Sequence, residues 1–233
     1  MANFSTHLVG AVGVGVVATA VLVSTELLPP ASLVSGVALV ALGGLFPDVD
    51  SDHSDAVTLV FDTLALAVAI PVMILAVPQL GLLGSLVLLG LVAAAFRYVL
   101  VVPFRWWTVH RGRFHSLPMG ALLACVVAGV DCYALGGDTV QAWVLGSLFA
   151  LGFAVHLVLD ELYAVDLGNR KLKLSFGSAF KLLDRSDLFG YGVLYGLLAL
   201  GLWLAPSPEP FARALAEVHL QWLPPDASAL AAG

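Results

Sequence analysis

The chain has 233 residues, of which 60% are hydrophobic and only 11% are charged, and its mean hydropathy is +0.99. Soluble domains are roughly 45–50% apolar and about 25% charged, so this composition excludes a water-soluble globule, a disordered chain and a disulfide scaffold. The formal net charge of −6 lacks the basic footprint of nucleic-acid-binding proteins, so we expect an integral membrane protein without a nucleic-acid partner.

Seven apolar runs follow one another along the chain, with prolines at several of the joins, among them Pro78. The runs cover residues 8–28, 31–46, 57–77, 80–102, 117–135, 140–164 and 188–205. The second run gives only about 24 Å of helix against a hydrocarbon core of about 30 Å, which places residues 46–50 near the membrane surface. The first run is longer than the apolar core of a signal peptide, and no Lys or Arg precedes it, so we interpret it as a retained span.

The distribution of positive charge predicts the orientation of these spans. Seven spans put nine of the ten Lys and Arg residues on the side of the N-terminus, and only Arg213 on the other side. The positive-inside rule then places the N-terminus in the cytoplasm and the C-terminus outside. We therefore predict an all-α, polytopic transmembrane helical bundle of about seven spans over residues 1–205, surrounded by membrane lipids.

Three further segments carry smaller predictions. The basic, partly apolar segment 170–185 is either an amphipathic stretch along anionic headgroups or an ordinary cytoplasmic loop. In the C-terminal tail, residues 206–233, apolar residues at helical spacing over 209–222 predict a short interfacial helix. Cys125 and Cys132 are separated by about 10 Å of helix rise, which is too far for a disulfide.

The histidines and acids gather on the predicted cytoplasmic side, although only Lys and Arg were used to assign that side. His156 and Asp160 lie four residues apart near the end of the sixth span, so that both side chains share one helix face. Such a pair is either a local hydrogen bond or part of a metal site. Ionisable groups within a span are costly and usually functional, which favours the second interpretation.

An acidic segment follows the second span. Asp48, Asp50, Asp52 and His53 fall within six residues, and like charges at that density repel one another unless a cation or bases neutralise them. The alternative is a solvated loop in which Asp52 or Asp55 caps the next helix. That alternative explains less well why the acids begin directly at the end of the span.

A basic segment precedes the fifth span. It contains His110, Arg111, Arg113 and His115. Histidines can ligate a metal, and the planar guanidinium groups suit phosphate oxygens. A positive-inside anchor would account for the arginines but not for the two histidines.

Nitrogen and oxygen donors without thiolates favour zinc, with manganese as the alternative divalent metal. A divalent ion activates water and polarises ester or phosphoryl oxygens, so the inferred reaction class is metal-assisted hydrolysis.

These motifs occur in an order that resembles the YdjM-like family of predicted membrane-bound, metal-dependent hydrolases of bacterial and archaeal inner membranes. The order is His7, then Gly-Leu-Phe-Pro-Asp-Val-Asp at 44–50, then the His110 to Ser116 motif, then His156-Leu-Val-Leu-Asp160, and the resemblance covers residues 1–166. It implies metal ligands at six positions, with His110 and Arg111 beside them: His7, Asp48, Asp50, His115, His156 and Asp160. Some relatives are labelled as LexA-binding, which implies a regulatory role instead.

A more distant similarity is to zinc-dependent phospholipase C and the S1/P1 nucleases, which are all-helical enzymes with clustered zinc. The matching set here would be Asp48 or Asp50, His115, and His156 with Asp160. We hypothesise a hydrolase of a phosphoester or lipid-linked phosphate at the cytoplasmic face, with Asp50, His115, Arg111 and His110 as catalytic residues and Arg113 as a second phosphate ligand. The alternative is a non-catalytic scaffold or regulatory protein whose metal is structural.

Overall fold

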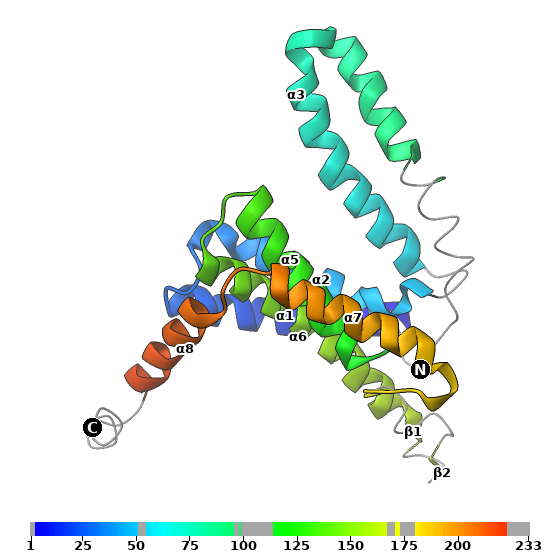
Figure 1. The fold of residues 1–233 in the computed structure, drawn as a ribbon, viewed down its shortest axis with the longest axis vertical. Helices are drawn as coiled ribbons and strands as arrows, with labels where there is room; N and C mark the ends of the chain where they lie inside the picture. The colour runs from blue at the N-terminus through cyan, green and yellow to red at the C-terminus, as the bar shows by residue number, and fades with distance from the viewer. Residues whose placement is uncertain are drawn as a thin grey trace. The chain divides into compact units, whose positions relative to one another are not determined.

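The chain is helical almost throughout, in a computed structural model that describes residues 3–50, 55–95, 98, 114–166, 171–172 and 180–222 (Figure 1). The strands in these ranges are β1 Val165–Asp166 and β2 Lys171–Leu172, which pair antiparallel. The predicted all-α class is confirmed. The chain divides into two compact units, the first made of Met1–Gly44 and Ser116–Gly233 and the second of Leu45–His115.

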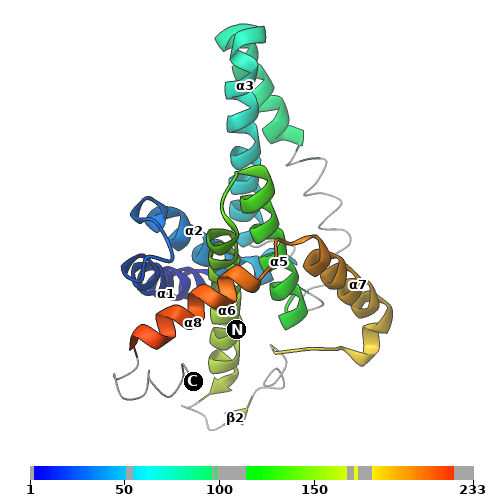
Figure 2. The same cartoon turned by 60° about the vertical axis from the view of Figure 1, so that its left-hand side comes forward.

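The first unit is organised around one long central helix, α6. Its helices are α1 Phe4–Ser24, α2 Leu33–Leu45 up to Gly44, α5 Leu117–Gly129 with the π-helical turn η4 Val130–Ala134, α6 Thr139–Ala164, α7 Leu188–Leu204 and α8 Glu209–Trp222, with the 3₁₀ turns η1 Pro30–Ser32 and η5 Arg185–Asp187. Helix α6 packs against α1, α5 and α8, and α7 packs against α5 (Figure 2). The buried apolar core of this unit lies on α6 and its neighbours: Ala11, Leu28, Val40, Val144, Leu145 and Leu148.

Glycines bring the backbones of α2 and α6 into direct contact. A Cβ atom added at Gly152 of α6 would lie 1.9 Å from the Val40 carbonyl oxygen, and one added at Gly43 of α2 would lie 2.1 Å from the Phe149 carbonyl oxygen. No other residue type fits at that separation. Small residues at helix contacts are the usual means of close packing in lipid, where burying apolar surface gives little driving force.

The second unit consists mainly of one helical hairpin. After the 3₁₀ turn η2 Phe46–Asp50 comes α3 Asp55–Ala95, whose 41 residues would be about 62 Å long if straight, twice the thickness of the hydrocarbon core. At Gly81 the backbone leaves the helical region with φ +66°, and Figure 1 shows α3 as two limbs joined at one end. The predicted join at Pro78 is therefore three residues early, because Pro78 stays within the helix.

Within the described residues, six helices are long and apolar enough to cross a membrane: Phe4–Ser24, Pro30–Asp48, Ala69–Ala95, Leu117–Ala134, Thr139–Ala164 and Arg185–Leu204. About seven spans is roughly consistent with this finding, since α3 reverses at Gly81 into two limbs, and the predicted span 80–102 extends past the described end of α3. Cys125 and Cys132 are free, as predicted.

Three sequence-based statements stay predictions. They are the orientation of the spans, the division of the chain at residue 205, and the interfacial position of the tail helix, although a helix, α8, does cover residues 209–222. The two interpretations of the basic segment 170–185 concern residues that lie partly outside the described ranges.

Candidate metal centre

Three ionisable side chains meet where the start of α1 lies beside the end of α6. His7 Nε2 is 3.4 Å from Asp160 Oδ1, and His156 Nε2 is 3.9 Å from Asp160 Oδ2. The His7 and His156 rings stack with centroids 3.8 Å apart and an interplanar angle of 12°. One donor atom from each of the three residues lies within 4.8 Å of the other two. The shared face of His156 and Asp160 is confirmed, and α1 adds His7 to it.

All three side chains of the cluster are buried. His7 and His156 are 0% exposed and Asp160 is 7% exposed. Neither ring nitrogen of His7 has a hydrogen-bond partner within the described part of the chain. Leaving a buried polar group unpaired costs about 1–3 kcal/mol. A protein that keeps an imidazole in this position therefore gains something from it other than packing.

The position of one proton on His156 follows from its hydrogen bond to Gly44. His156 Nδ1 lies 2.7 Å from the backbone carbonyl oxygen of Gly44, and both groups are buried. Because a carbonyl oxygen only accepts, Nδ1 carries the proton and donates it, which leaves the lone pair of the neutral ring on Nε2. Metal-binding histidines characteristically donate their other ring N–H to such an acceptor.

These three residues fit a divalent metal. Zinc binds imidazole nitrogen and carboxylate oxygen at about 2.0–2.2 Å, so that tetrahedral ligand atoms lie roughly 3.3 Å apart. The observed separations of 3.4 and 3.9 Å are close to that value. Two nitrogens and one oxygen suit zinc and also manganese. The donor chemistry, the spacing and the lack of a hydrogen bond to His7 within the described residues agree with such a site.

A second pair of predicted ligands lies together within the second unit. Asp48, in η2, has its Oδ1 3.6 Å from His115 Nε2, and the His115 residue is 3% exposed. These two residues lie near opposite ends of the unit in sequence. Asp50 ends η2, but its side chain is outside the described part of the structure.

The remaining predicted residues lie outside the described ranges, and their roles stay predictions. They are Asp52 and His53 of the acidic segment, and His110, Arg111 and Arg113 of the basic one.

The sequence did not indicate that Tyr191 carries a buried hydroxyl. This residue of α7 is 1% exposed, and its hydroxyl lies beside the Ser116 side chain without a hydrogen bond of good geometry within the described residues. Ser116 itself is fully buried and follows His115 directly. A tyrosine inside an apolar run gives no local signal of this kind, because only tertiary packing decides whether its hydroxyl reaches water.

The segment before α7 is held by a local ionic network. Asp184 accepts hydrogen bonds from Ser186 Oγ at 2.5 Å and Ser186 N at 3.0 Å, and from Lys181 Nζ at 2.9 Å. These bonds, led by the Ser186 hydroxyl, hold the pKa of Asp184 well below its usual range. The ionised carboxylate neutralises Lys181 and caps η5, so this end of the basic segment has a structural role.

Comparison with known proteins identifies the family. Residues 1–168 match the family described as YdjM inner membrane protein, and this range contains every predicted metal ligand. No curated protein and no solved structure matches the chain, so the distant similarity to phospholipase C and the nucleases gains no support. The family match covers well over half of the chain, and the described residues hold six helices apolar enough to cross a membrane. The chain therefore belongs to the YdjM family and is a multi-pass inner membrane protein.

Proposed function

We propose that this protein is a metal-dependent hydrolase that acts on a phosphoester or lipid-linked phosphate at the cytoplasmic face of the membrane. The observation that carries the proposal is the buried cluster of His7, His156 and Asp160. A carboxylate and two imidazoles withdrawn from water inside a membrane bundle are costly unless a cation compensates them.

The proposed ligand set joins this cluster to Asp48, Asp50 and His115. Chain connectivity supports the inclusion of Asp48. The carbonyl of Gly44 accepts a hydrogen bond from His156, and Asp48 follows Gly44 by four residues, which span at most about 14 Å. Chain connectivity also supports the inclusion of His115, because His115 directly precedes Ser116 at the start of α5.

The register of α5 against α6 supports the same set. Gly120 of α5 lies against the Phe153 ring of α6, and the two helices run antiparallel, since Gly146 lies against Ala124. Moving one turn back along α5 from Gly120 corresponds to moving one turn forward along α6 from Phe153. Ser116 is therefore at about the level of His156.

The chain's own residues have defined tasks in this proposal. A bound divalent ion supplies Lewis acidity and lowers the pKa of its water toward neutrality. Gly44 fixes the His156 ring through its carbonyl, so that Nε2 is available without a change of tautomer. Arg111 and Arg113 bind and neutralise the substrate phosphate through their planar forks. Asp50, His115 and His110 position the water and the reacting phosphoryl group.

The depth of the cluster favours a lipid substrate. His7 is the fourth residue of α1 and Asp160 lies four residues before the end of α6, so both are within about 6 Å of a helix end. A phosphate at headgroup depth can reach such a site without entering the hydrocarbon core. The basic residues predicted on this side would attract the same anionic group.

Metal content is the first test. We expect detergent-purified wild-type protein to contain stoichiometric zinc or manganese by mass spectrometry, and a His156→Gln, Asp160→Asn double variant to lose it. A matched double variant on α8, His219→Ala with Glu217→Gln, should keep the metal. Negligible metal in all three proteins, after purification without chelator and with metal added back, would overturn the proposal.

Turnover is the second test. Asp50→Ala and His115→Ala should abolish hydrolysis of a phosphoester panel without loss of membrane insertion, and retained turnover would contradict the catalytic roles.

Burial also favours a second candidate function, a non-catalytic scaffold or regulatory protein. The three clustered side chains are at most 7% exposed, and structural metal sites are closed whereas catalytic sites keep an open position. Stoichiometric metal combined with no turnover on any phosphoester would favour this candidate.

A further inference from the structure

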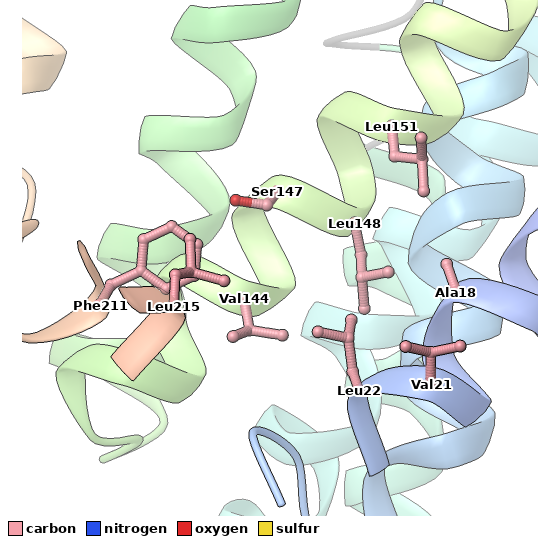
Figure 3. A pocket seen from close by; sticks show the side chains of 9 residues that line it. All are labelled: Ala18, Val21, Leu22, Val144, Ser147, Leu148, Leu151, Phe211 and Leu215. Atoms are coloured by element: carbon pink, nitrogen blue, oxygen red, sulfur yellow. The ribbon is translucent and has the colours of Figure 1, made fainter. Parts of the chain in front are cut away.

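An apolar groove of about 550 Å³ lies along the first unit, away from the metal cluster (Figure 3). Three helices line it, namely α1, α6 and α8. Its residues are Ala18, Val21 and Leu22 of α1, Val144, Ser147, Leu148 and Leu151 of α6, and Phe211 and Leu215 of α8. We propose that this groove binds one acyl chain of a membrane phospholipid.

The chemistry of the walls selects a hydrocarbon. Eight of the nine lining side chains carry only carbon and hydrogen, and the ninth contributes the single hydroxyl of Ser147. No charged group faces the groove among these residues. An ion, a phosphate or a sugar would lose its hydration there without gaining partners. Apolar cavities of this kind stay dry and take up apolar ligands.

The position of the groove along α1 and α6 separates it from the cluster of His7, His156 and Asp160. Ala18 comes 11 residues after His7 on α1, which is about 16 Å of helix, and Ser147 comes nine residues before His156 on α6, which is about 14 Å. Both helices are long and apolar enough to span the membrane. The groove therefore lies toward the other end of both helices from the His7, His156 and Asp160 cluster, and its proposed ligand does not depend on the proposed hydrolysis.

The groove opens sideways, toward the surroundings of the spans. Val21 is 50% exposed, Leu215 is 42% exposed and Ser147 is exposed, whereas Val144 and Leu148 form a buried floor. For an inner membrane protein those surroundings are lipid. An acyl chain can thus enter from the bilayer without any helix having to move.

The shape of the space favours a slender occupant over a helix. A helix with its side chains is at least about 10 Å across, or roughly 80 Å² in section, so 550 Å³ holds little more than one turn of it. If a helix from a second copy of this chain docked here, most of that helix would lie outside the groove. A flexible hydrocarbon chain fills the same volume along its length.

Helix α8 makes the groove a defined site. Its apolar residues Phe211 and Leu215 face the groove, while Glu209 and Arg213 pair with each other on its exposed face. Before α8, the Trp143 indole N–H of α6 donates to the Pro206 carbonyl at 2.9 Å, which fixes the connection to α6. One wall is therefore held in place by a specific bond.

Retention of lipid tests the proposal. We expect native mass spectrometry of the full chain in mild detergent to show one retained phospholipid per chain, and Ser147→Trp, which fills the groove from an exposed position, to reduce that fraction at least tenfold. Val126→Trp is the matched control, because Val126 is 49% exposed on α5 and does not line the groove. Wild-type helix content by circular dichroism and a single symmetric peak in size-exclusion chromatography would show that both variants are folded.

Equal retention in Ser147→Trp and wild type would overturn the proposal, as would retention of detergent alone or a dimer in place of the lipid adduct. A phospholipid with a photoreactive group at the end of its acyl chain gives an independent measurement. It should label the peptide containing residues 144–151 in wild type and not in Ser147→Trp. Labelling of equal strength in both would also refute the assignment.

Discussion

The substitution Gly152→Ala tests how helix packing supports the metal cluster. Its new methyl group would lie 1.9 Å from the Val40 carbonyl oxygen, 2.8 Å from the Val40 carbonyl carbon and 2.9 Å from the Gly44 nitrogen. All three atoms belong to the backbone of α2, so no side-chain rotation relieves the clash. The two helices must separate.

The size of the separation follows from these distances. Cβ atoms essentially never approach closer than 3.0 Å, so the Val40 oxygen must move by at least 1.1 Å. The same shift, applied to Gly44, lengthens its 2.7 Å hydrogen bond with His156 Nδ1 to about 3.8 Å, beyond bonding distance. Overpacking costs typically about 1–3 kcal/mol and the lost hydrogen bond about 1 kcal/mol. We expect a loss of about 2–4 kcal/mol in unfolding free energy, together with weaker metal binding.

Denaturant unfolding in detergent and metal titration measure the two effects. The matched control is Gly13→Ala of α1, where an added Cβ meets nothing within 4 Å. In that helix interior alanine is better than glycine by about 0.5–1 kcal/mol, so the two variants should change stability in opposite directions. Wild-type stability and metal affinity in Gly152→Ala would refute the packing argument. Weaker metal binding without a loss of stability would contradict the expected decrease in unfolding free energy.

Three other outcomes are expected. Chelation should lower the stability of wild type by about 2.7 kcal/mol relative to metal at 100 times its dissociation constant, and should leave Asp160→Asn unchanged in a fluorescence-monitored unfolding assay. Tyr191→Phe should be neutral or stabilising by up to about 1 kcal/mol, while Tyr195→Phe, which removes a 2.8 Å hydrogen bond to a backbone carbonyl, should cost about 1 kcal/mol. Because the pKa of Asp184 is lowered in the folded protein, the stability that its carboxylate contributes is fully present above the usual carboxyl pKa and is lost only as the pH falls through the lowered value. The backbone amide of Ser186 should therefore exchange its hydrogen more slowly in wild type than in Asp184→Asn down to about pH 4.

The sequence predicted the local half of the histidine–aspartate cluster and much of the fold. Apolar runs identify spans because lipid requires every backbone group to be bonded within its own helix. His156 and Asp160 were predictable together because a spacing of four places them on one face whatever surrounds the helix. The reversal in α3 was placed at a proline, but the residue that can adopt φ +66° is Gly81.

The rest of the cluster depends on tertiary contacts. The pairing of His7 with Asp160 requires α1 to pack on α6, and no spacing within α1 encodes that partner. The resemblance to a known family pointed to His7, but periodicity did not. Gly44 acts through its backbone carbonyl, which every residue possesses, so its bond to His156 has no sequence signature. The burial of the Tyr191 hydroxyl was not predictable for the same reason, since it depends on how α5 and α7 pack together.

The segment from Gly43 to Asp48 shows why a motif of this kind combines glycines with an acid. In lipid, helices approach closely only through small residues, and Gly43 brings the α2 backbone onto α6. That approach lets the carbonyl of Gly44 accept the Nδ1 proton of His156, which turns the lone pair of Nε2 toward Asp160. Four residues later the same segment carries Asp48, paired with His115. The six residues therefore combine a helix contact, a hydrogen bond that fixes the His156 ring and an acidic turn. A change in the glycines should alter the surroundings of His156 before any side chain of the cluster is changed.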